Sequence, residues 1–233
     1  MMPPLALLAG GLATRMRPLT EMVPKALLEV AGEPFIAHQL RLLNREGIAR
    51  VVLCVSYKWQ MIRDFVGDGS QFGIEAVYSV DGPHLLGTGG ALRHALPHLG
   101  DEFLVMYGDS WLDTTFAAIV EAFRRSGKPA LMTVFRNESQ WDASNVCYQD
   151  GTILLYDKLA RLPQMHHIDW GLSVVRSTTL ADQPIDKHFD LADVFTALSR
   201  RGELAGFEVM TRFYEIGSPQ GLHETDAVIR AAR

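Results

Sequence analysis

Residues 9–25 read Ala-Gly-Gly-Leu-Ala-Thr-Arg-Met-Arg-Pro-Leu-Thr-Glu-Met-Val-Pro-Lys, and this stretch gives the strongest indication of the fold. The short apolar run at residues 5–9 leads into it and predicts the first strand of a domain. Gly10 and Gly11 end that strand, because a backbone without Cβ atoms can turn tightly and approach a ligand closely. The segment therefore predicts a strand followed by a ligand-binding loop.

Three basic residues, Arg15, Arg17 and Lys25, follow the glycines in the same loop. A glycine turn with free N–H groups and fixed cations is typical of polyphosphate binding. The loop contains neither Gly-x-Gly-x-x-Gly nor Gly-x-x-x-x-Gly-Lys-Ser/Thr, which argues against a dinucleotide-binding Rossmann domain and a kinase-like P-loop. The alternative is an ordinary glycine turn with solvated basic side chains.

The loop resembles the signature of the sugar-1-phosphate nucleotidyltransferases. That family carries Gly-Gly-x-Gly/Ala-Thr-Arg-Leu/Met-x-Pro-x-Thr, then Pro-Lys, a small residue or proline, and an aliphatic residue. The matching positions are Gly10, Gly11, Ala13, Thr14, Arg15, Met16, Pro18, Thr20, Pro24, Lys25, Ala26 and Leu27. Within the family the chain is most similar to the short bacterial guanylyltransferases that act on D-glycero-α-D-manno-heptose 1-phosphate. The features that carry this narrower likeness are Val55-Ser56-Tyr57-Lys58, Leu86-Gly87-Thr88-Gly89-Gly90-Ala91 and Glu215-Ile216-Gly217.

Length and composition limit the class of protein. The 233 residues, 48% of them hydrophobic and 21% charged, suit one large domain or two small ones with a sizeable core. The net charge of −5 argues against a nucleic-acid partner. Cys54 and Cys147 lie in separate apolar runs, so two buried thiols in a reducing cytoplasm are expected. No run approaches the ~18 apolar residues of a membrane-spanning helix, so no membrane partner is expected. The apolar start has no charged n-region, is interrupted by Gly10 and Gly11 and runs into Arg15 and Arg17, so a signal peptide is not expected either.

Hydrophobic periodicity predicts alternating strands and helices in the first half and mostly strands in the second. Strands are predicted at residues 5–9, 27–30, 50–57, 74–79, 103–107, 131–136, 145–149, 153–157, 167–176, 207–210 and 213–216. Helices are predicted at residues 34–46, 59–65, 87–96, 191–200 and 223–232. This order indicates a parallel, doubly wound α/β core.

The resemblance implies one Rossmann-like α/β domain of the nucleotidyltransferase (GT-A) type, with a mixed, mainly parallel sheet flanked by helices. Residues 1–112 would form the nucleotide-binding half and residues 113–233 the sugar-binding half. The β-helix of longer family members is not expected here, nor is acetyl transfer. A homodimer is compatible with the resemblance.

Joining a nucleoside triphosphate to a sugar 1-phosphate is an in-line displacement at the α-phosphorus. The attacking oxygen is already anionic, so the protein must offset repulsion between two anions and stabilise pyrophosphate rather than supply a base. The resemblance assigns catalysis to Arg15, Lys25 and Asp109. Arg15 would hold the β- and γ-phosphates and Lys25 the phosphate of the sugar, whereas Arg17 is either a phosphate contact or a surface charge.

The expected cofactor is Mg²⁺, a hard cation that one or two carboxylates can hold. Asp109 follows a buried strand and a glycine, where the family holds its metal; a helix N-cap is the alternative. Relatives carry a second metal aspartate in an Asp-Val/Ile-Gly-Thr run, and the corresponding run here is Glu215-Ile216-Gly217-Ser218. Glu215 is therefore predicted as the second ligand, with a surface-strand glutamate as the alternative.

The resemblance also assigns the binding residues of both substrates. Those for the nucleotide are Ala9, Gly10, Gly11, Thr14, Arg15, Gly87 and Thr88. Those for the sugar are Asn145, Asp157, Lys158, Asp169 and Gly171. Trp170 stands where relatives have a small residue, so it would close part of the pocket or stack on the ligand.

The expected partners are thus a nucleoside triphosphate and a sugar 1-phosphate, and the narrower likeness implies that the triphosphate is GTP. The nearest rival reactions use mannose or N-acetylmuramate 1-phosphate, the latter with uridylyl transfer. A glycosyltransferase would need an Asp-x-Asp motif, which Asp109-Ser110-Trp111 does not supply. A non-catalytic nucleotide-binding regulator would not need Arg15, Lys25 and Asp109 together.

Overall fold

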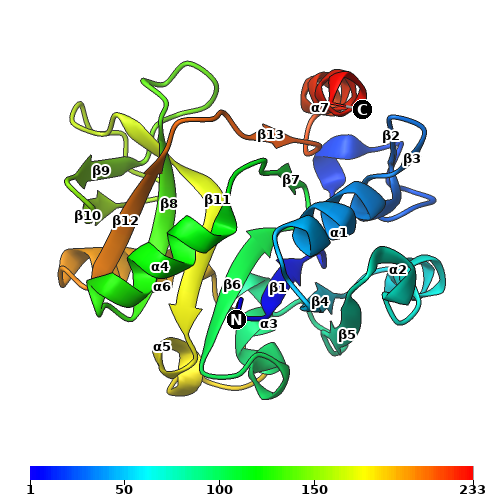
Figure 1. Cartoon of the computed structure of the whole chain (residues 1–233), viewed down its shortest axis with the longest axis horizontal. Helices are drawn as coiled ribbons and strands as arrows, with labels where there is room; N and C mark the ends of the chain where they lie inside the picture. Colours follow the sequence, from blue (N-terminus) through cyan, green and yellow to red (C-terminus); the bar gives the residue numbers. More distant parts are fainter. Residues whose placement is uncertain (233) are drawn as a thin grey trace.

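The computed structural model describes residues 1–232, and its centre is a nine-stranded sheet of order β5-β4-β1-β6-β11-β8-β12-β10-β9 (Figure 1). The strands are β1 (Leu5–Leu8), β4 (Arg50–Val55), β5 (Glu75–Val80), β6 (Glu102–Tyr107), β8 (Ala130–Arg136), β9 (Val146–Gln149), β10 (Thr152–Tyr156), β11 (His167–Arg176) and β12 (Leu204–Val209). Strands β5, β4, β1 and β6 are parallel, as the sequence predicts. Strand β11 is antiparallel to β6 and β8, β12 is parallel to β8, and β10 is antiparallel to β12 and β9. The fold is the predicted mixed α/β architecture.

Helices cover both faces of this sheet. Helices α1 (Phe35–Arg45), α2 (Trp59–Val66) and α4 (Phe116–Ser126) pack on one face, and α3 (Gly87–Ala95), α5 (Thr178–Ala181) and α6 (Leu191–Arg200) on the other. Figure 1 shows α1 and α4 in front of the sheet. Strand β1 directs Leu5 and Leu7 into the first layer and Ala6 into the second. Both faces of β1, β4 and β6 are buried, which explains their nearly continuous apolar sequences, whereas the edge strand β5 is only partly buried.

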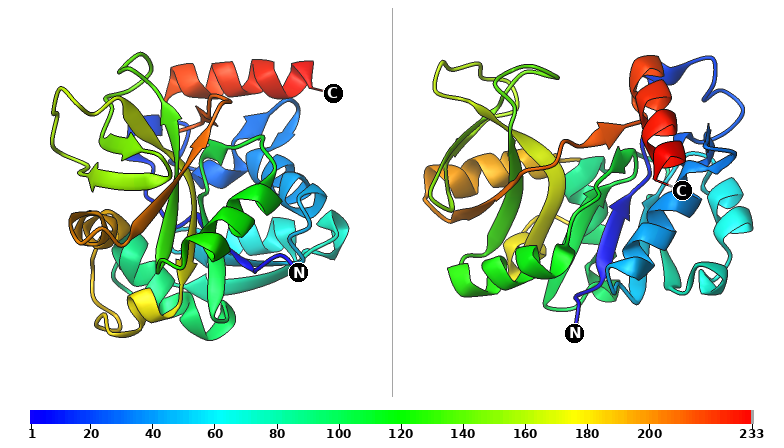
Figure 2. Two further views of the ribbon diagram at one scale, coloured as in Figure 1. Left: turned by 60° about the vertical axis from the view of Figure 1, so that its left-hand side comes forward. Right: turned by 45° about the horizontal axis from the view of Figure 1, so that its top comes forward.

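The C-terminal segment returns to the N-terminal half. After β12 the chain passes through β13 (Tyr214–Glu215) to α7 (Pro219–Ala231), as Figure 2 shows. Strand β13 pairs with β7 (Ser110–Trp111), and α7 lies beside the hairpin of β2 (Glu29–Val30) and β3 (Glu33–Pro34). Ile216 and Ile229 pack with Val30 and Trp111 in a small third core. This packing holds the end of the chain against the loops that follow β1 and β6.

Several boundaries differ from the predictions. Helix α4 has no predicted counterpart, although Phe116, Ile119, Val120 and Phe123 have helical spacing. Helix α7 begins at Pro219 rather than residue 223, because the Ser218 side chain caps it. The predicted strand at residues 27–30 is confirmed only for Glu29–Val30, which form β2. Its first residue, Leu27, belongs instead to a short 3₁₀ helix. The short 3₁₀ helices are η1 (Thr14–Met16), η2 (Lys25–Leu27), η3 (Ser70–Phe72) and η4 (Leu96–His98).

None of the helices within residues 1–232 combines the length and hydropathy that crossing a lipid bilayer requires.

Candidate active site

A cavity of about 270 Å³ opens at the carboxyl ends of β1, β4, β5 and β6, where open α/β sheets bind ligands. Its lining residues are Leu8, Ala9, Gly10, Gly11, Lys25, Ala26, Cys54, Asp81, Leu85, Gly87, Thr88, Ala91, Tyr107, Gly108, Asp109 and His188. Seven of the residues that the sequence predicts for catalysis or nucleotide binding are among them. They are Ala9, Gly10, Gly11, Lys25, Gly87, Thr88 and Asp109. The predicted residues Thr14 and Arg15 are exposed and lie outside this lining.

The glycine turn lies against the end of β4. A Cβ atom on Gly10 would lie 3.2 Å from Ser56 Oγ, which itself donates a hydrogen bond to Gly10 O. Within residues 1–232, the N–H groups of Gly10 and Gly11 have no hydrogen-bond acceptor. The turn therefore presents two free donors at the cavity wall, as an anion-binding loop should.

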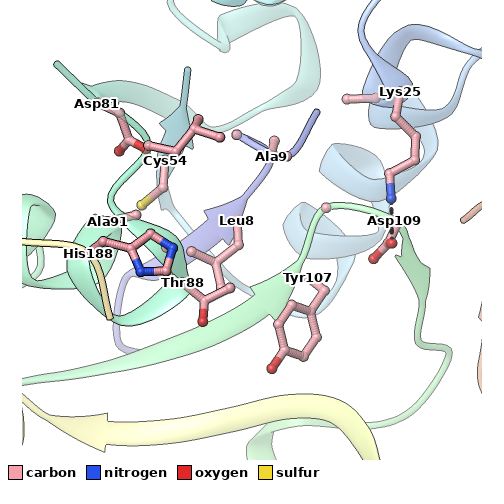
Figure 3. Close-up of a pocket in the computed structure, with 16 residues that line it drawn as sticks. Leu8, Ala9, Lys25, Cys54, Asp81, Thr88, Ala91, Tyr107, Asp109 and His188 are labelled. Atoms are coloured by element: carbon pink, nitrogen blue, oxygen red, sulfur yellow. Dashed lines mark hydrogen bonds and ion pairs between the residues drawn. The ribbon is translucent and has the colours of Figure 1, made fainter. Parts of the chain in front are cut away.

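Gly108 brings Asp109 to this turn. The N–H of Gly108 donates to Leu8 O at 3.0 Å, and a Cβ atom there would lie only 2.8 Å from the same oxygen. The crossing of the ends of β1 and β6 thus requires a glycine. The next residue, Asp109, forms a 2.6 Å ion pair with Lys25 Nζ through Oδ2 (Figure 3). Two of the predicted catalytic residues, 84 positions apart, are in direct contact.

Glu215 approaches the same carboxylate from the C-terminal segment. It pairs with Ser110 in the β7–β13 ladder, and Ile216 N donates to Asp109 O at 2.9 Å. A Cβ atom on Gly217 would lie 2.5 Å from Glu215 Oε2, 3.4 Å from Asp109 Oδ2 and 3.5 Å from Arg15 Nη2. The two carboxylates and the guanidinium therefore meet around Gly217.

The Glu215 carboxylate is held in place on both oxygens. Oε2 accepts from Gly217 N, and Oε1 accepts from Ser218 Oγ at 2.8 Å. Gly221 gives it room, since a Cβ atom there would clash with Oε1. Within residues 1–232 no three His, Cys, Asp or Glu side chains form a metal-binding group. The pair Asp109 and Glu215 is the candidate metal centre, and both supply the oxygen atoms that a hard cation prefers.

The glycines at the start of α3 pack against the segment that precedes α6. Gly89 N and Gly90 N donate to Phe189 O at 3.0 and 3.3 Å. A Cβ atom on Gly87 would lie 2.5 Å from that oxygen, and one on Gly90 would lie 2.5 Å from Lys187 O. Close backbone packing therefore explains these glycines, which the sequence attributes to ligand contact; Gly87 also lines the cavity.

Gly90→Ala is expected to lower the free energy of unfolding by about 2–4 kcal/mol, because the new Cβ meets backbone that cannot move aside. Helix propensity alone predicts the opposite sign, a gain of up to about 1 kcal/mol. Gly82→Ala is the control, since nothing lies within 4 Å of its Cβ position. Urea unfolding measures both; a Gly90→Ala protein as stable as the parent would contradict the packing.

Thr88 joins the two halves of the site. Its hydroxyl donates to Asp190 Oδ1 at 2.5 Å and accepts from Leu191 N at 2.9 Å. Asp190 caps α6 and pairs with Lys158 Nζ at 2.7 Å. Burial opposes the ionisation of Asp190, but hydrogen bonds from Lys158 and Thr88 outweigh it and lower the pKa. The predicted nucleotide residue Thr88 and the predicted sugar residue Lys158 thus share one carboxylate.

The other predicted sugar residues form a hydrogen-bonded group outside the cavity lining. Asn145 Oδ1 accepts from Asp169 N at 3.1 Å, and Asp169 Oδ1 accepts from Gly171 N at 2.9 Å. Asp157 N donates to Asn145 O at 3.1 Å. A bulge in β11 after Asp169, with Gly171 at φ +100°, produces this geometry. The structure brings these residues together.

Trp170 does not stack on a ligand. Its side chain is buried in the core, and its indole Nε1 donates to Thr211 O at 2.7 Å. Trp170 packs in the same core layer as Leu172 and Val174, so the expectation that it closes the pocket or stacks on the ligand is wrong. The adjacent histidines, His166 and His167, contact Glu138 and Glu208 at 3.2 and 3.1 Å.

Burial changes the ionisation of several groups near the cavity. It raises the pKa of the Cys54 thiol to about 12, with a smaller contribution from the charge of Asp81. It also raises the pKa of Tyr107 well above the usual value, with the nearby charge of Asp169 as the second cause. Both groups remain neutral at physiological pH. Cys54 and Cys147 are free thiols, as expected.

Asp169→Asn is expected to stabilise the protein at neutral pH. Burial raises the pKa of Asp169 from 3.8 to about 6, so the folded state holds this proton more tightly than the unfolded state. Its contribution to stability therefore falls as the pH rises from about 4 to 6, and asparagine avoids a cost of about 1–3 kcal/mol above pH 6. Urea unfolding at pH 4.5 and 7.5 should show the difference between the two proteins widening with pH. A difference independent of pH would contradict this assignment.

Sequence reasoning missed four polar residues at or beside the cavity: Asp81, Tyr107, His188 and Asp190. Asp81 follows a predicted strand on the same sheet edge as Asp109, and that position is a signal that could have found it. Tyr107 ends the strand that leads to Asp109. His188 and Asp190 lie between α5 and α6 in a segment without periodicity, and only the tertiary fold brings them to the cavity.

Comparisons with known proteins agree on one family. The curated mannose-1-phosphate guanylyltransferase catalytic subunit beta of Drosophila pseudoobscura pseudoobscura is 29% identical over 219 residues, 92% of this chain and 59% of that protein. The N-acetylmuramate alpha-1-phosphate uridylyltransferase of Neisseria meningitidis serogroup B is 42% identical over 113 residues, 48% of this chain and 49% of that protein. The matched part of the chain therefore spans about half to three fifths of the length of these curated relatives.

A solved structure shares the whole fold. The crystal structure of HddC from Yersinia pseudotuberculosis complexed with GMP-PN has a TM-score of 0.82 with 22% identity, covering 98% of this chain and 100% of that one. At that identity the likeness shows the fold alone. Residues 6–144, more than half of the chain, match the family described as Nucleotidyl transferase. The chain thus belongs to the nucleotidyl transferase family.

Proposed function

We propose that the chain transfers a nucleotidyl group from a nucleoside triphosphate to a sugar 1-phosphate and releases pyrophosphate. The observation that carries the proposal is the meeting of Arg15, Asp109 and Glu215 around Gly217, beside the Lys25–Asp109 ion pair. Fixed cations and paired carboxylates next to a free N–H turn are what phosphoryl-type transfer between two anions needs.

In this reaction an oxygen of the sugar phosphate forms a bond to the α-phosphorus, and the bond from that phosphorus to the β-phosphate oxygen breaks. The electron pair leaves with pyrophosphate, so no protein base is required. Gly10 and Gly11 donate N–H groups to the phosphates, and Arg15 offsets the charge that grows on pyrophosphate. Lys25 holds the incoming phosphate, which lowers the repulsion between the two substrates.

Mg²⁺ is the proposed cofactor, and the donor set fits it: two carboxylates whose oxygens, Asp109 Oδ2 and Glu215 Oε2, lie close to the Gly217 position. When bound, the ion would supply positive charge at the phosphate oxygens. Asp109 and Glu215 would hold it, and the hydrogen bonds to Glu215 keep that side chain in position.

We propose GTP and D-glycero-α-D-manno-heptose 1-phosphate as substrates, for the synthesis of capsule or surface polysaccharide. The narrower sequence likeness supports heptose. The guanylyl part is also supported by the mannose-1-phosphate guanylyltransferases that match across 92% of the chain. Mannose 1-phosphate is the nearest alternative.

Uridylyl transfer to N-acetylmuramate 1-phosphate is the second candidate, because the Neisseria relative has the higher identity, 42%, over 48% of the chain.

The test is pyrophosphate release with Mg²⁺, crossing GTP, UTP, CTP, ATP and dTTP with heptose, mannose, glucose and N-acetylmuramate 1-phosphates. Turnover confined to GTP and manno-configured sugars supports the proposal. Turnover with another pair keeps the chemistry and replaces the substrates. No release with any pair favours a nucleotide-binding regulator.

A further inference from the structure

The cavity has two chemically different ends. Figure 3 shows the Lys25–Asp109 ion pair at one side and Asp81 at the other, with Ala9 and Leu8 between them. On the proposed function, phosphates occupy the side with the lysine and the free N–H groups. The base of the nucleotide is then directed toward Asp81.

Asp81 is rigidly placed. Its N–H donates to Val55 O at 2.9 Å, which fixes it at the carboxyl ends of β4 and β5. Its Oδ2 accepts from Leu86 N at 3.2 Å. Within residues 1–232, Oδ1 has no hydrogen-bond partner, although the side chain lines the cavity. A fixed acceptor is therefore left for a ligand.

The surroundings of Asp81 suit a flat aromatic ring. Cys54 and Ala91 lie on the same side of the cavity as Asp81 in Figure 3, and the Cys54 thiol is neutral; Leu85 also lines the cavity. Burial raises the pKa of Asp81, which shows that water solvates its charge poorly. A poorly solvated carboxylate gains from each donor that a ligand supplies.

The nucleobases differ in the donors that they can offer. A carboxylate only accepts hydrogen bonds, and each of its oxygens can accept more than one. Guanine presents two adjacent donors, N1–H and the 2-amino group. Uracil and thymine present one N–H between two carbonyl oxygens, while adenine and cytosine present an amino group beside an acceptor nitrogen. Only guanine can donate to both oxygens of a carboxylate along one edge without opposing an acceptor to it.

We propose that Asp81 selects guanine by accepting hydrogen bonds from N1–H and the 2-amino group. The proposal rests on the proposed nucleotidyl transfer, because that reaction directs the phosphates to the opposite side of the cavity. Asp81 is then the side chain that determines which nucleoside triphosphate the cavity prefers.

The experiment compares GTP with ITP, which lacks the 2-amino group, and with XTP, which carries a carbonyl there. Equilibrium binding is measured without sugar phosphate, and kcat/KM is measured with it. The wild-type protein is expected to prefer GTP over ITP by about 10- to 100-fold.

The Asp81→Asn variant should lose this preference and favour XTP over GTP. Its amide oxygen still accepts from N1–H, and its amide NH₂ donates to the carbonyl of xanthine. Asparagine can also accept from Leu86 N, so the loop keeps its conformation. The control is Asp64→Asn on the exposed face of α2, which should retain the wild-type order.

Four results separate this proposal from the function on which it rests. Equal binding of GTP and ITP, or an Asp81→Asn variant that weakens all nucleotides alike, overturns the role of Asp81. A wild-type preference for UTP also overturns it, while nucleotidyl transfer stands. Selective GTP binding that Asp81→Asn converts to XTP binding, without pyrophosphate release, supports the role of Asp81 and overturns the proposed reaction.

Discussion

Replacing Asp109 by alanine is expected to lower kcat for pyrophosphate release by about 10³-fold. Oδ2 of Asp109 forms an ion pair with Lys25 Nζ at 2.6 Å. The same oxygen lies 3.4 Å from where a Cβ atom on Gly217 would be, next to the Glu215 carboxylate. On the proposed function the substitution removes a metal ligand, and it leaves Lys25 without the carboxylate with which it pairs. Steady-state kinetics across a range of Mg²⁺ concentrations is the measurement, and added Mg²⁺ should not restore the rate.

The matched control is Asp113→Ala, an exposed acid four residues further along that pairs with Arg45. It should leave kcat within about twofold, because exposed ion pairs contribute little. Melting temperatures of both variants check that they are folded. An Asp109→Ala protein with the full rate would exclude a metal-assisted mechanism at this carboxylate.

The second large effect is expected at Arg15. Arg15→Ala should lower kcat by about 10²- to 10³-fold, because on the proposed function its guanidinium offsets charge on the leaving pyrophosphate. Its Nη2 lies 3.5 Å from where a Cβ atom on Gly217 would be. Arg15→Lys should recover only part of the rate, since an ammonium cannot form the bidentate contact. Arg15 is exposed, so the stability of either variant should hardly change.

Arg17 provides the comparison within the same loop. It is also exposed, and its role as phosphate contact or surface charge is open from sequence. Arg17→Ala should leave kcat close to the wild-type value. Equal losses in the two alanine variants would instead indicate general electrostatic attraction of the nucleotide, which added salt would weaken.

The parallel half of the fold could be predicted from sequence because its strands are short apolar runs that end in glycine or polar residues. The carboxyl ends of such strands share one edge of the sheet, so the sequence alone could place Gly10 and Asp109 near each other. Helix α4 was missed although its apolar spacing is regular.

The parts of the site that sequence could not supply depend on contacts between distant segments. The ion pair of Lys25 with Asp109 and the hydrogen bond of Thr88 to Asp190 join residues 84 and 102 positions apart. No local pattern encodes such distances. The glycines of α3 could not be interpreted from sequence either. A glycine is required both where a backbone approaches a ligand and where it packs against another backbone, and here the second applies. The buried position of Trp170, by contrast, follows the alternation that places Leu172 and Val174 in the same core layer.

The β7–β13 ladder has a consequence for the order in which a nascent chain acquires its parts. The cavity is lined by residues 8 to 188, so all of its walls have been synthesised well before residue 215 is added. Glu215 reaches Asp109 only after β13 has been made and paired with β7. On the proposed chemistry, a growing polypeptide has every wall of its nucleotide pocket before it has both carboxylates. On that chemistry, catalytic competence follows the completion of the pocket walls during translation.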